Sequence, residues 1–159
     1  RHLLQSIARS FAIMKRAAPE LRMVLVAGPR VPVDAFPRID GLEVRPYMHK
    51  LFEHLSCCDL ALVQGGLSTC MELVAARRPF LSFPLRRHFE QCVHVRNRLR
   101  NYGADRSVDY ESLTPEALAE KALAAMDEPV RYRPVETDGA ARAARRIAEV
   151  LDNRWWIGR

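Results

Sequence analysis

Residues 60–72 read LALVQGGLSTCME and decide the fold. The apolar run 60–63 predicts a buried strand, and the segment from Leu67 onward predicts a helix. Two glycines between them let a backbone come close to a phosphate, and the start of the helix offers unpaired N–H groups with about half a unit of positive charge. Ser68 and Glu72 are four residues apart, so they share one face of this helix. The arrangement suits a diphosphate at Ser68 and a ribose at Glu72.

Short apolar strands alternate with amphipathic helices along the rest of the chain. We expect strands at 23–27, 42–44, 60–63, 80–83 and 106–108. We expect helices at 3–18, 51–55, 67–76 and 89–101, from Pro115 after the capping residue Thr114, and at 139–151. This order predicts an α/β fold with a doubly wound parallel sheet, in one domain of residues 1–159. Ligands of such sheets bind beyond the carboxyl ends of the strands, where the loops after Val63 and Phe83 lie.

The chain begins directly in a helix, without an initiator methionine. A doubly wound domain normally opens with a strand. We therefore expect the sequence to be a piece of a longer polypeptide, with its first strand missing. At the other end, Trp155 and Trp156 are expected to pack either on the missing half or on their own domain.

The composition, 48% hydrophobic and 28% charged residues, is that of an ordinary globular protein. No run approaches the roughly 18 apolar residues of a membrane span, and no secretory leader opens the sequence. The four cysteines form no C-x-x-C pair, so neither a zinc site nor a redox motif is indicated. We expect buried, reduced thiols and a cytoplasmic location.

The net charge of +6 comes from 22 arginines against three lysines. Such a balance favours anionic partners, phosphates among them. The arginines are spread along the chain and are not interleaved with aromatic residues, so no nucleic-acid partner is expected.

The tract from Glu43 to Gly103 resembles the C-terminal, donor-binding half of GT-B glycosyltransferases. It is similar to the branch that contains family 28, with the bacterial lipid II-forming N-acetylglucosaminyltransferase, and the UDP-glycosyltransferases. The resemblance rests on Gly65-Gly66-x-Ser68-x-x-x-Glu72, then Pro79, Pro84, Glu90-Gln91 and Gly103. Two glycines alone would be a weak signal, and the whole set at these intervals is a much stronger one. It implies a Rossmann-like half of a GT-B fold.

The resemblance also implies a role for each matched residue. The donor diphosphate would contact Gln64, Gly65, Gly66, Ser68 and Thr69. Glu72 would accept hydrogen bonds from both ribose hydroxyls, which suits the two oxygens of a carboxylate. The base, most often uracil in this branch, would contact Tyr47 and Met48, and the sugar would contact His88, Glu90 and Gln91. The implied donor is a UDP-sugar such as UDP-N-acetylglucosamine.

Several positions depart from the family pattern. Gln64 replaces a frequent His, so it can donate a hydrogen bond to a diphosphate but brings no charge. Arg77 replaces the usual Gly after the helix, where a left-handed Arg costs about 1 kcal/mol unless the turn differs. His94 replaces a common Asn, and Asp105 replaces a Gly. These changes bear more on the sugar assignment than on the diphosphate and ribose.

Each candidate residue also has a plainer interpretation. Ser68 would be a helix N-cap if its hydroxyl accepted a backbone hydrogen bond, and Glu72 would be a solvated charge. Residues 90–91 would simply begin a helix. His88 is expected to cap or to contact sugar in preference to acting as a base, since the resemblance places the base in the other half. Arg86 and Arg87 would either lend positive potential to the diphosphate or be solvated loop residues.

These observations predict the donor half of a glycosyltransferase that transfers a hexosyl group to an acceptor hydroxyl. The catalytic base is unassigned and is expected in a missing N-terminal, acceptor-binding half, in the same or a partner chain. Any peripheral membrane association would run through that half. The sequence contains no Asp-x-Asp motif, so neither metal nor cofactor is expected. The chain alone is expected to bind donor and to turn over weakly or not at all. The alternatives are a non-catalytic nucleotide-sugar-binding partner module and half of a UDP-sugar 2-epimerase.

Overall fold

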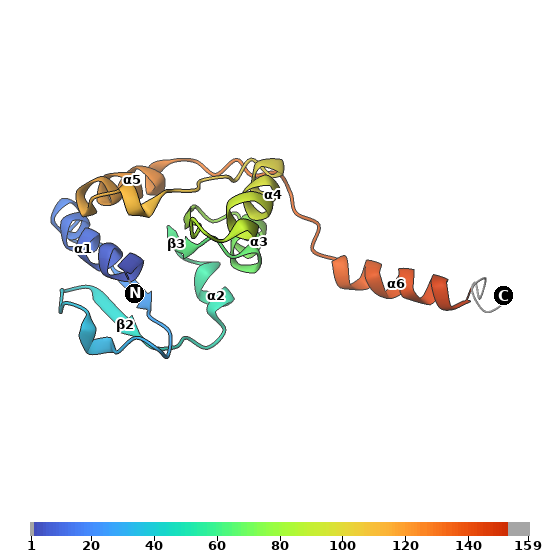
Figure 1. Ribbon diagram of the computed structural model, residues 1–159, viewed down its shortest axis with the longest axis horizontal. Coiled ribbons are helices and arrows are strands. Elements are labelled where there is room, and N and C mark those ends of the chain that lie inside the picture. The colour runs from blue at the N-terminus through green and yellow to red at the C-terminus, as the bar shows by residue number, and fades with distance from the viewer. Residues whose placement is uncertain (1, 153–159) are drawn as a thin grey trace.

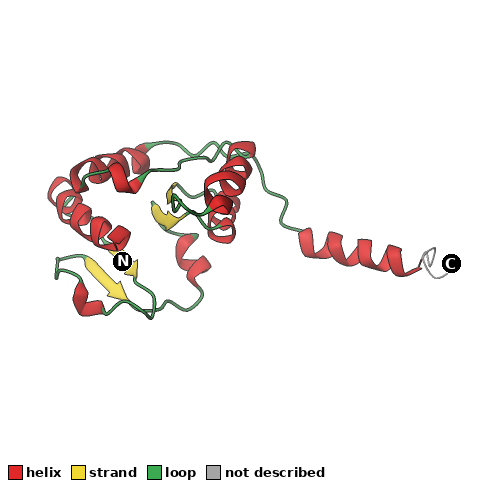
Figure 2. Ribbon diagram, in the orientation of Figure 1, coloured by secondary structure: helices red, strands yellow, loops and turns green. Residues whose placement is uncertain are grey.

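The computed structural model describes residues 2–152, apart from the side chain of Tyr110, so the Trp155-Trp156 pair lies outside the described residues. In chain order the elements are α1 (His2–Ala17), β1 (Met23–Val26), η1 (Val33–Ala35), β2 (Leu42–Arg45), α2 (Leu51–Leu55), β3 (Ala61–Gln64), α3 (Leu67–Ala75), β4 (Phe80–Phe83), η2 (Glu90–Val95), α4 (Arg96–Asn101), η3 (Tyr110–Ser112), α5 (Pro115–Asp127) and α6 (Gly139–Asp152). Strands and helices alternate as expected, which confirms the α/β class (Figure 1, Figure 2).

All the strand pairs among the described residues are parallel, as the sequence predicts, and they form two pairs. β1 lies beside β2 with Leu25 opposite Val44, and β3 lies beside β4 with Val63 opposite Ser82. The strand expected at 106–108 is reduced to one bridge, in which Ser107 stands opposite Ser82. The side chain of Asp105 accepts the N–H of Ser107, so this segment pairs on one side only.

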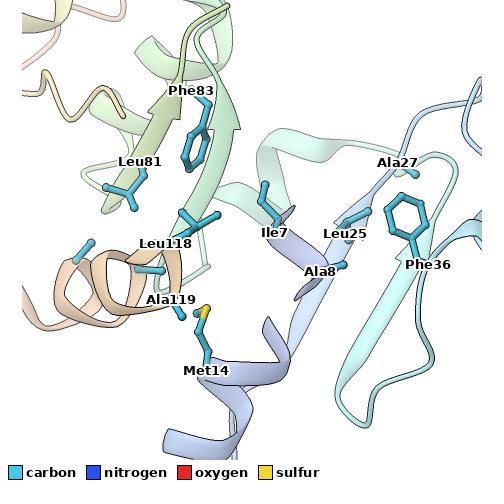
Figure 3. Close-up of a cluster of buried hydrophobic side chains, with 12 residues drawn as sticks. Ile7, Ala8, Met14, Leu25, Ala27, Phe36, Leu81, Phe83, Leu118 and Ala119 are labelled. Carbon is cyan, nitrogen blue, oxygen red and sulfur yellow. The ribbon is translucent and has the colours of Figure 1, made fainter. Parts of the chain in front are cut away.

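Strand β4 is the centre of the fold, because all four of its residues are buried. Leu81 and Phe83 point to one side, into a cluster that joins β4 to α1, α5 and β1 (Figure 3). The labelled members of this cluster are Ile7, Ala8, Met14, Leu25, Ala27, Phe36, Leu81, Phe83, Leu118 and Ala119. Phe80 points to the other side, into a second cluster with Leu73 of α3 and Leu99 of α4. Burial on both faces explains why β4 is continuously apolar and does not alternate.

Helix α5 begins as its sequence predicts. The Thr114 hydroxyl accepts a hydrogen bond from the N–H of Ala117 at 3.2 Å, and Pro115 occupies the first helical position. This cap satisfies one of the donors that a helix start leaves unpaired. The buried face of α5, with Leu118 and Ala122, then packs beside α1.

Helix α6 stands away from the rest of the chain (Figure 1). Each of its residues is exposed, and none belongs to either core cluster. Its larger apolar side chains nevertheless share one face, with Ile147 61% and Leu151 57% exposed. The apolar face of α6 is therefore uncovered within the described part of the chain. Between residues 2 and 152, no helix combines the length and the apolar character needed to cross a membrane.

The two-sided core predicts where substitutions are costly. Leu118→Ala should lower the free energy of unfolding by about 2–5 kcal/mol, because the 1%-exposed side chain leaves a cavity against β4. Ile147→Ala on α6 is the matched control and should change it by less than about 0.5 kcal/mol. Urea denaturation monitored by circular dichroism measures both. Equal effects of the two substitutions would contradict the assignment of the core.

Candidate functional site

The turn between β3 and α3 has the geometry of an anion site at a helix start. Gly66 is the N-cap, with extended backbone at φ −77° and ψ 137°. The first helical hydrogen bond runs from the N–H of Cys70 to the carbonyl of Gly66, at 3.1 Å. The N–H groups of residues 67–69 precede that bond and so have no acceptor within α3. They point out of the helix with its positive end behind them, as the sequence predicts.

The two glycines of this turn are required for different reasons. A Cβ on Gly65 would lie 3.0 Å from the Cα and 3.2 Å from the Cβ of Pro84, so Gly65 is where β3 packs against the end of β4. A Cβ on Gly66 would meet no described atom within 4 Å, so the backbone there is open to a ligand. Gly65 is thus explained by packing against Pro84, which the sequence did not reveal, whereas no packing contact explains Gly66.

One face of helix α3 is buried in the core, and the opposite face is exposed to solvent. Cys70, Leu73 and Val74 enter the second core cluster, while Ser68 and Glu72 are exposed one turn apart. Neither of these two polar side chains is hydrogen-bonded or ion-paired to another residue of the described part of the chain. Ser68 is the second residue of the helix and not its N-cap, so the plainer interpretation of Ser68 is wrong. Thr69 is half-buried and Gln64 is exposed.

The end of α3 confirms the left-handed conformation considered for Arg77. Its φ is 54°, and its N–H donates to the carbonyl of Val74 at 3.1 Å. The next N–H, of Arg78, donates to the carbonyl of Leu73 at 3.0 Å. These two bonds form a Schellman motif, whose left-handed position normally favours glycine. The guanidinium of Arg78 also donates to the carbonyl of Ser56, at 2.6 Å, and so ties α3 to the end of α2.

The loop 84–89 follows β4 and lies beside the β3–α3 turn through the Gly65–Pro84 contact. His88 and Glu90 are exposed in this region, and Gln91 is half-buried. Gln91 Oε1 accepts the N–H of Leu85 at 3.0 Å. The thiol of Cys92 donates to the carbonyl of Leu85, also at 3.0 Å. Cys92 was not among the sequence candidates, and only its place directly after Gln91 could have indicated it.

The expected helix 89–101 is in fact a π-helix, η2, that continues into α4. A π-turn inserts an extra residue into the helical ladder and occurs preferentially at functional sites. His94, which departs from the family pattern, is exposed, and its ring meets Phe89 edge-on at 5.2 Å between centroids. Asp105, another departure, is ion-paired with Arg96 and Arg100 at 3.4 and 3.0 Å. Asp105 therefore ties α4 to the segment that follows it.

Arg86 is ion-paired with two acidic side chains, Asp109 and Glu111. It pairs with Asp109 at 2.5 Å and with Glu111 at 3.2 Å. The hydrogen bond from Arg86 lowers the pKa of Asp109. Leu85, Arg86, Arg87 and Glu111 line an open groove of about 550 Å³ next to this loop.

The expected base contacts lie on the other strand pair. Tyr47 and Met48 follow the carboxyl end of β2, where Tyr47 is 70% exposed and Met48 only 8%. Of these two side chains, only that of Tyr47 is therefore exposed to solvent. That either residue contacts a base stays a prediction.

The described residues include four cysteines, of which one is fully buried. No three His, Cys, Asp or Glu side chains in that range are grouped so that they could hold a metal ion. Cys70, beneath the turn, is fully buried, and this burial raises its pKa to about 11. Its thiol is thus protonated at neutral pH and not a nucleophile. Cys57 is exposed and Cys58 and Cys92 are half-buried, so the expectation of buried thiols holds for Cys70 alone.

A protein-family model matches residues 13–151, and its description is "Glycosyltransferase family 28 C-terminal domain". Two curated relatives, both described as "Uncharacterized glycosyltransferase", come from Methanosarcina species. The protein from Methanosarcina acetivorans is 34% identical over 74 residues, which are 46% of this chain and 19% of the relative. The protein from Methanosarcina mazei is 27% identical over 135 residues, which are 84% of this chain and 34% of the relative. The matched part of the chain thus spans about a third or less of these relatives.

A solved structure entitled "Crystal Structure Analysis of the Glycotransferase of kitacinnamycin" superposes with a TM-score of 0.60 at 18% identity. The superposition covers 77% of this chain and 31% of the other. At this identity the likeness shows the fold alone. It supports the Rossmann-like half of a GT-B fold that the sequence motif implies.

The two glycines should respond differently to the same substitution. Gly65→Ala should lower the free energy of unfolding by about 1–3 kcal/mol, because the new Cβ meets the backbone of Pro84. Gly66→Ala should change it by less than about 0.5 kcal/mol, since the poorer N-cap is offset by a less flexible unfolded chain. Denaturant titration measures both. A Gly65→Ala variant as stable as the wild type would show that the β3 and β4 ends are not packed as described.

The left-handed Arg77 predicts a stabilising substitution. Arg77→Gly should raise the free energy of unfolding by about 1 kcal/mol, because glycine adopts positive φ without steric cost. Arg78→Gly at the adjacent position should lower it, because the bond to Ser56 is lost. Thermal unfolding of the two variants beside the wild type measures the signs. A destabilising Arg77→Gly would contradict the Schellman geometry.

Proposed function

This chain belongs to the family of glycosyltransferase family 28 C-terminal domains, and from that membership we propose that it binds the UDP-sugar from which a hexosyl group is transferred to an acceptor hydroxyl. One observation carries the proposal: an uncovered helix start at Gly66 lies one turn from an exposed, unpaired carboxylate, Glu72, on the same helix. A diphosphate fits the first feature and a ribose the second.

The spacing along α3 matches the ligand. Ser68 and Glu72 are separated by four residues, or about 6 Å along the helix axis. That is comparable with the separation between the α-phosphate and the ribose hydroxyls of a nucleotide. The Ser68 hydroxyl and the N–H groups of residues 67–69 would donate to phosphate oxygens, and Glu72 would accept from the ribose hydroxyls. Gln64, exposed at the end of β3, would add a neutral donor.

The same groups would assist the transfer step. When the acceptor oxygen attacks the anomeric carbon, the bond to the diphosphate breaks and negative charge builds on the leaving phosphate. Fixed N–H dipoles stabilise such charge without having to reorganise. This chain's part is to hold and neutralise the leaving group, and we propose that it does so without a metal ion. We place the base that deprotonates the acceptor in a second domain.

Two observations support that second domain. The relatives from Methanosarcina extend well beyond the part that this chain matches. The apolar face of α6, with Ile147 and Leu151, is uncovered within residues 2–152. We propose that an N-terminal acceptor-binding domain, in the same or a partner chain, completes the enzyme. The chain by itself should then bind donor without rapid turnover.

Calorimetry with UDP and with inorganic pyrophosphate tests the proposal. Ser68→Ala should weaken both ligands by about tenfold or more, because it removes a hydrogen bond to a charged group. Glu72→Ala should weaken UDP to a similar degree and leave pyrophosphate unweakened, since pyrophosphate has no ribose. Glu120→Ala, an exposed Glu on α5, is the control and should affect neither. If neither Ser68→Ala nor Glu72→Ala weakens UDP, the donor does not bind at α3.

A further inference from the structure

We infer that Gln91 shapes the loop 84–89 by holding Leu85, and that this hydrogen bond turns the NH₂ group of Gln91 away from Leu85, where it can donate to a bound sugar. The inference rests on the proposed function and deepens it at the same site. The resemblance implies that Gln91 contacts sugar, without saying which end of its amide faces the ligand or what positions the loop.

Both backbone groups of Leu85 are held by the start of the π-helix. The Leu85 N–H donates to Gln91 Oε1 at 3.0 Å, and its carbonyl accepts from the Cys92 thiol at 3.0 Å. The same thiol lies 3.6 Å from the carbonyl of Arg86, and the N–H of His88 closes a turn onto Leu85 at 2.9 Å. The backbone hydrogen bond to Gln91 is the stronger link, because a thiol is a weak donor. The hydrogen bond from the Leu85 N–H to Gln91 Oε1 is therefore the main interaction that holds the loop 84–89 in place, and we call it the latch.

The latch also determines the orientation of the Gln91 amide. An amide side chain carries one acceptor oxygen and one NH₂ group, and the Leu85 N–H can only donate. The atom that faces Leu85 must therefore be the oxygen, whichever way an unconstrained amide would turn. The NH₂ group then faces away from Leu85 and has no partner within the described part of the chain. What it can bind is an acceptor, such as a hydroxyl oxygen or an acetamido carbonyl.

The neighbouring Glu90 has the opposite character. Its carboxylate is exposed and, when ionised, only accepts hydrogen bonds. Residues 90 and 91 thus present an acceptor beside a donor. A sugar with a hydroxyl to donate and an adjacent oxygen to accept satisfies both, and UDP-N-acetylglucosamine is such a donor substrate. Gln91 is a positioning residue for the loop and a donor toward the sugar.

Two substitutions separate the two roles. Gln91→Glu keeps an oxygen that accepts from Leu85 and removes the NH₂ donors, whereas Gln91→Ala removes both. We measure amide hydrogen exchange at Leu85 without ligand, and the affinities for UDP and UDP-N-acetylglucosamine by calorimetry. Exchange at Leu85 should be about tenfold faster in Gln91→Ala and unchanged in Gln91→Glu. The ratio of UDP-N-acetylglucosamine to UDP affinity should fall about tenfold in both variants.

The outcomes are distinguishable. Unchanged Leu85 exchange in Gln91→Ala overturns the latch. An unchanged affinity ratio in Gln91→Glu overturns the donor role. If the wild type binds neither UDP nor UDP-N-acetylglucosamine, the proposed function fails and the donor role fails with it, while Leu85 exchange still decides the latch. The exchange measurement needs no ligand, so it separates a wrong loop geometry from a wrong substrate.

Discussion

The contact between Gly65 and Pro84 places the two halves of the candidate site side by side. Gly65 belongs to the turn that opens α3, and Pro84 begins the loop that carries His88 and leads into Glu90 and Gln91 of η2. Strand β4 is held in place by buried side chains on both faces, so the position of Pro84 is set by the core. Because β3 pairs with β4 in parallel, both strands deliver their carboxyl ends to the same edge. A diphosphate at the turn would therefore lie beside the loop expected to hold the sugar.

Typical magnitudes indicate which groups would contribute most to holding a diphosphate at the start of α3. The field of a helix start contributes about 0.3–1 kcal/mol toward an exposed anion, whereas each hydrogen bond to a charged group contributes about 1.5–3 kcal/mol. The directed N–H groups of residues 67–69 and the Ser68 hydroxyl should therefore outweigh the dipole. Arg86 adds charge nearby, but it is ion-paired with Asp109 and Glu111. Exposed pairs of this kind are worth about 1 kcal/mol or less, so a ligand could recruit Arg86 at small cost.

Local sequence patterns predicted most of this architecture because each acts over a few residues. The strand–Gly–Gly–helix order located the turn, and the four-residue spacing placed Ser68 and Glu72 on one face. Long-range contacts were not predictable in the same way. The role of Gly65 depends on Pro84, 19 residues away in the sequence. The latch on Leu85 depends on a π-turn that has no signature in composition or period. The segment 106–108 has the sequence of a strand, but it pairs with β4 only through a single bridge to Ser82. The N–H of Ser107 donates to the Asp105 side chain and so is not available to a second strand.

We propose that the backbone amides at the start of α3 bind a pyrophosphoryl group. Amide chemical shifts of the labelled chain, followed by nuclear magnetic resonance during a titration with UDP, test it directly. We expect saturable shifts that are largest at the amides of residues 67–69, with smaller changes at Glu72. Shifts that are absent there, or that concentrate on the arginines of α6, would contradict it.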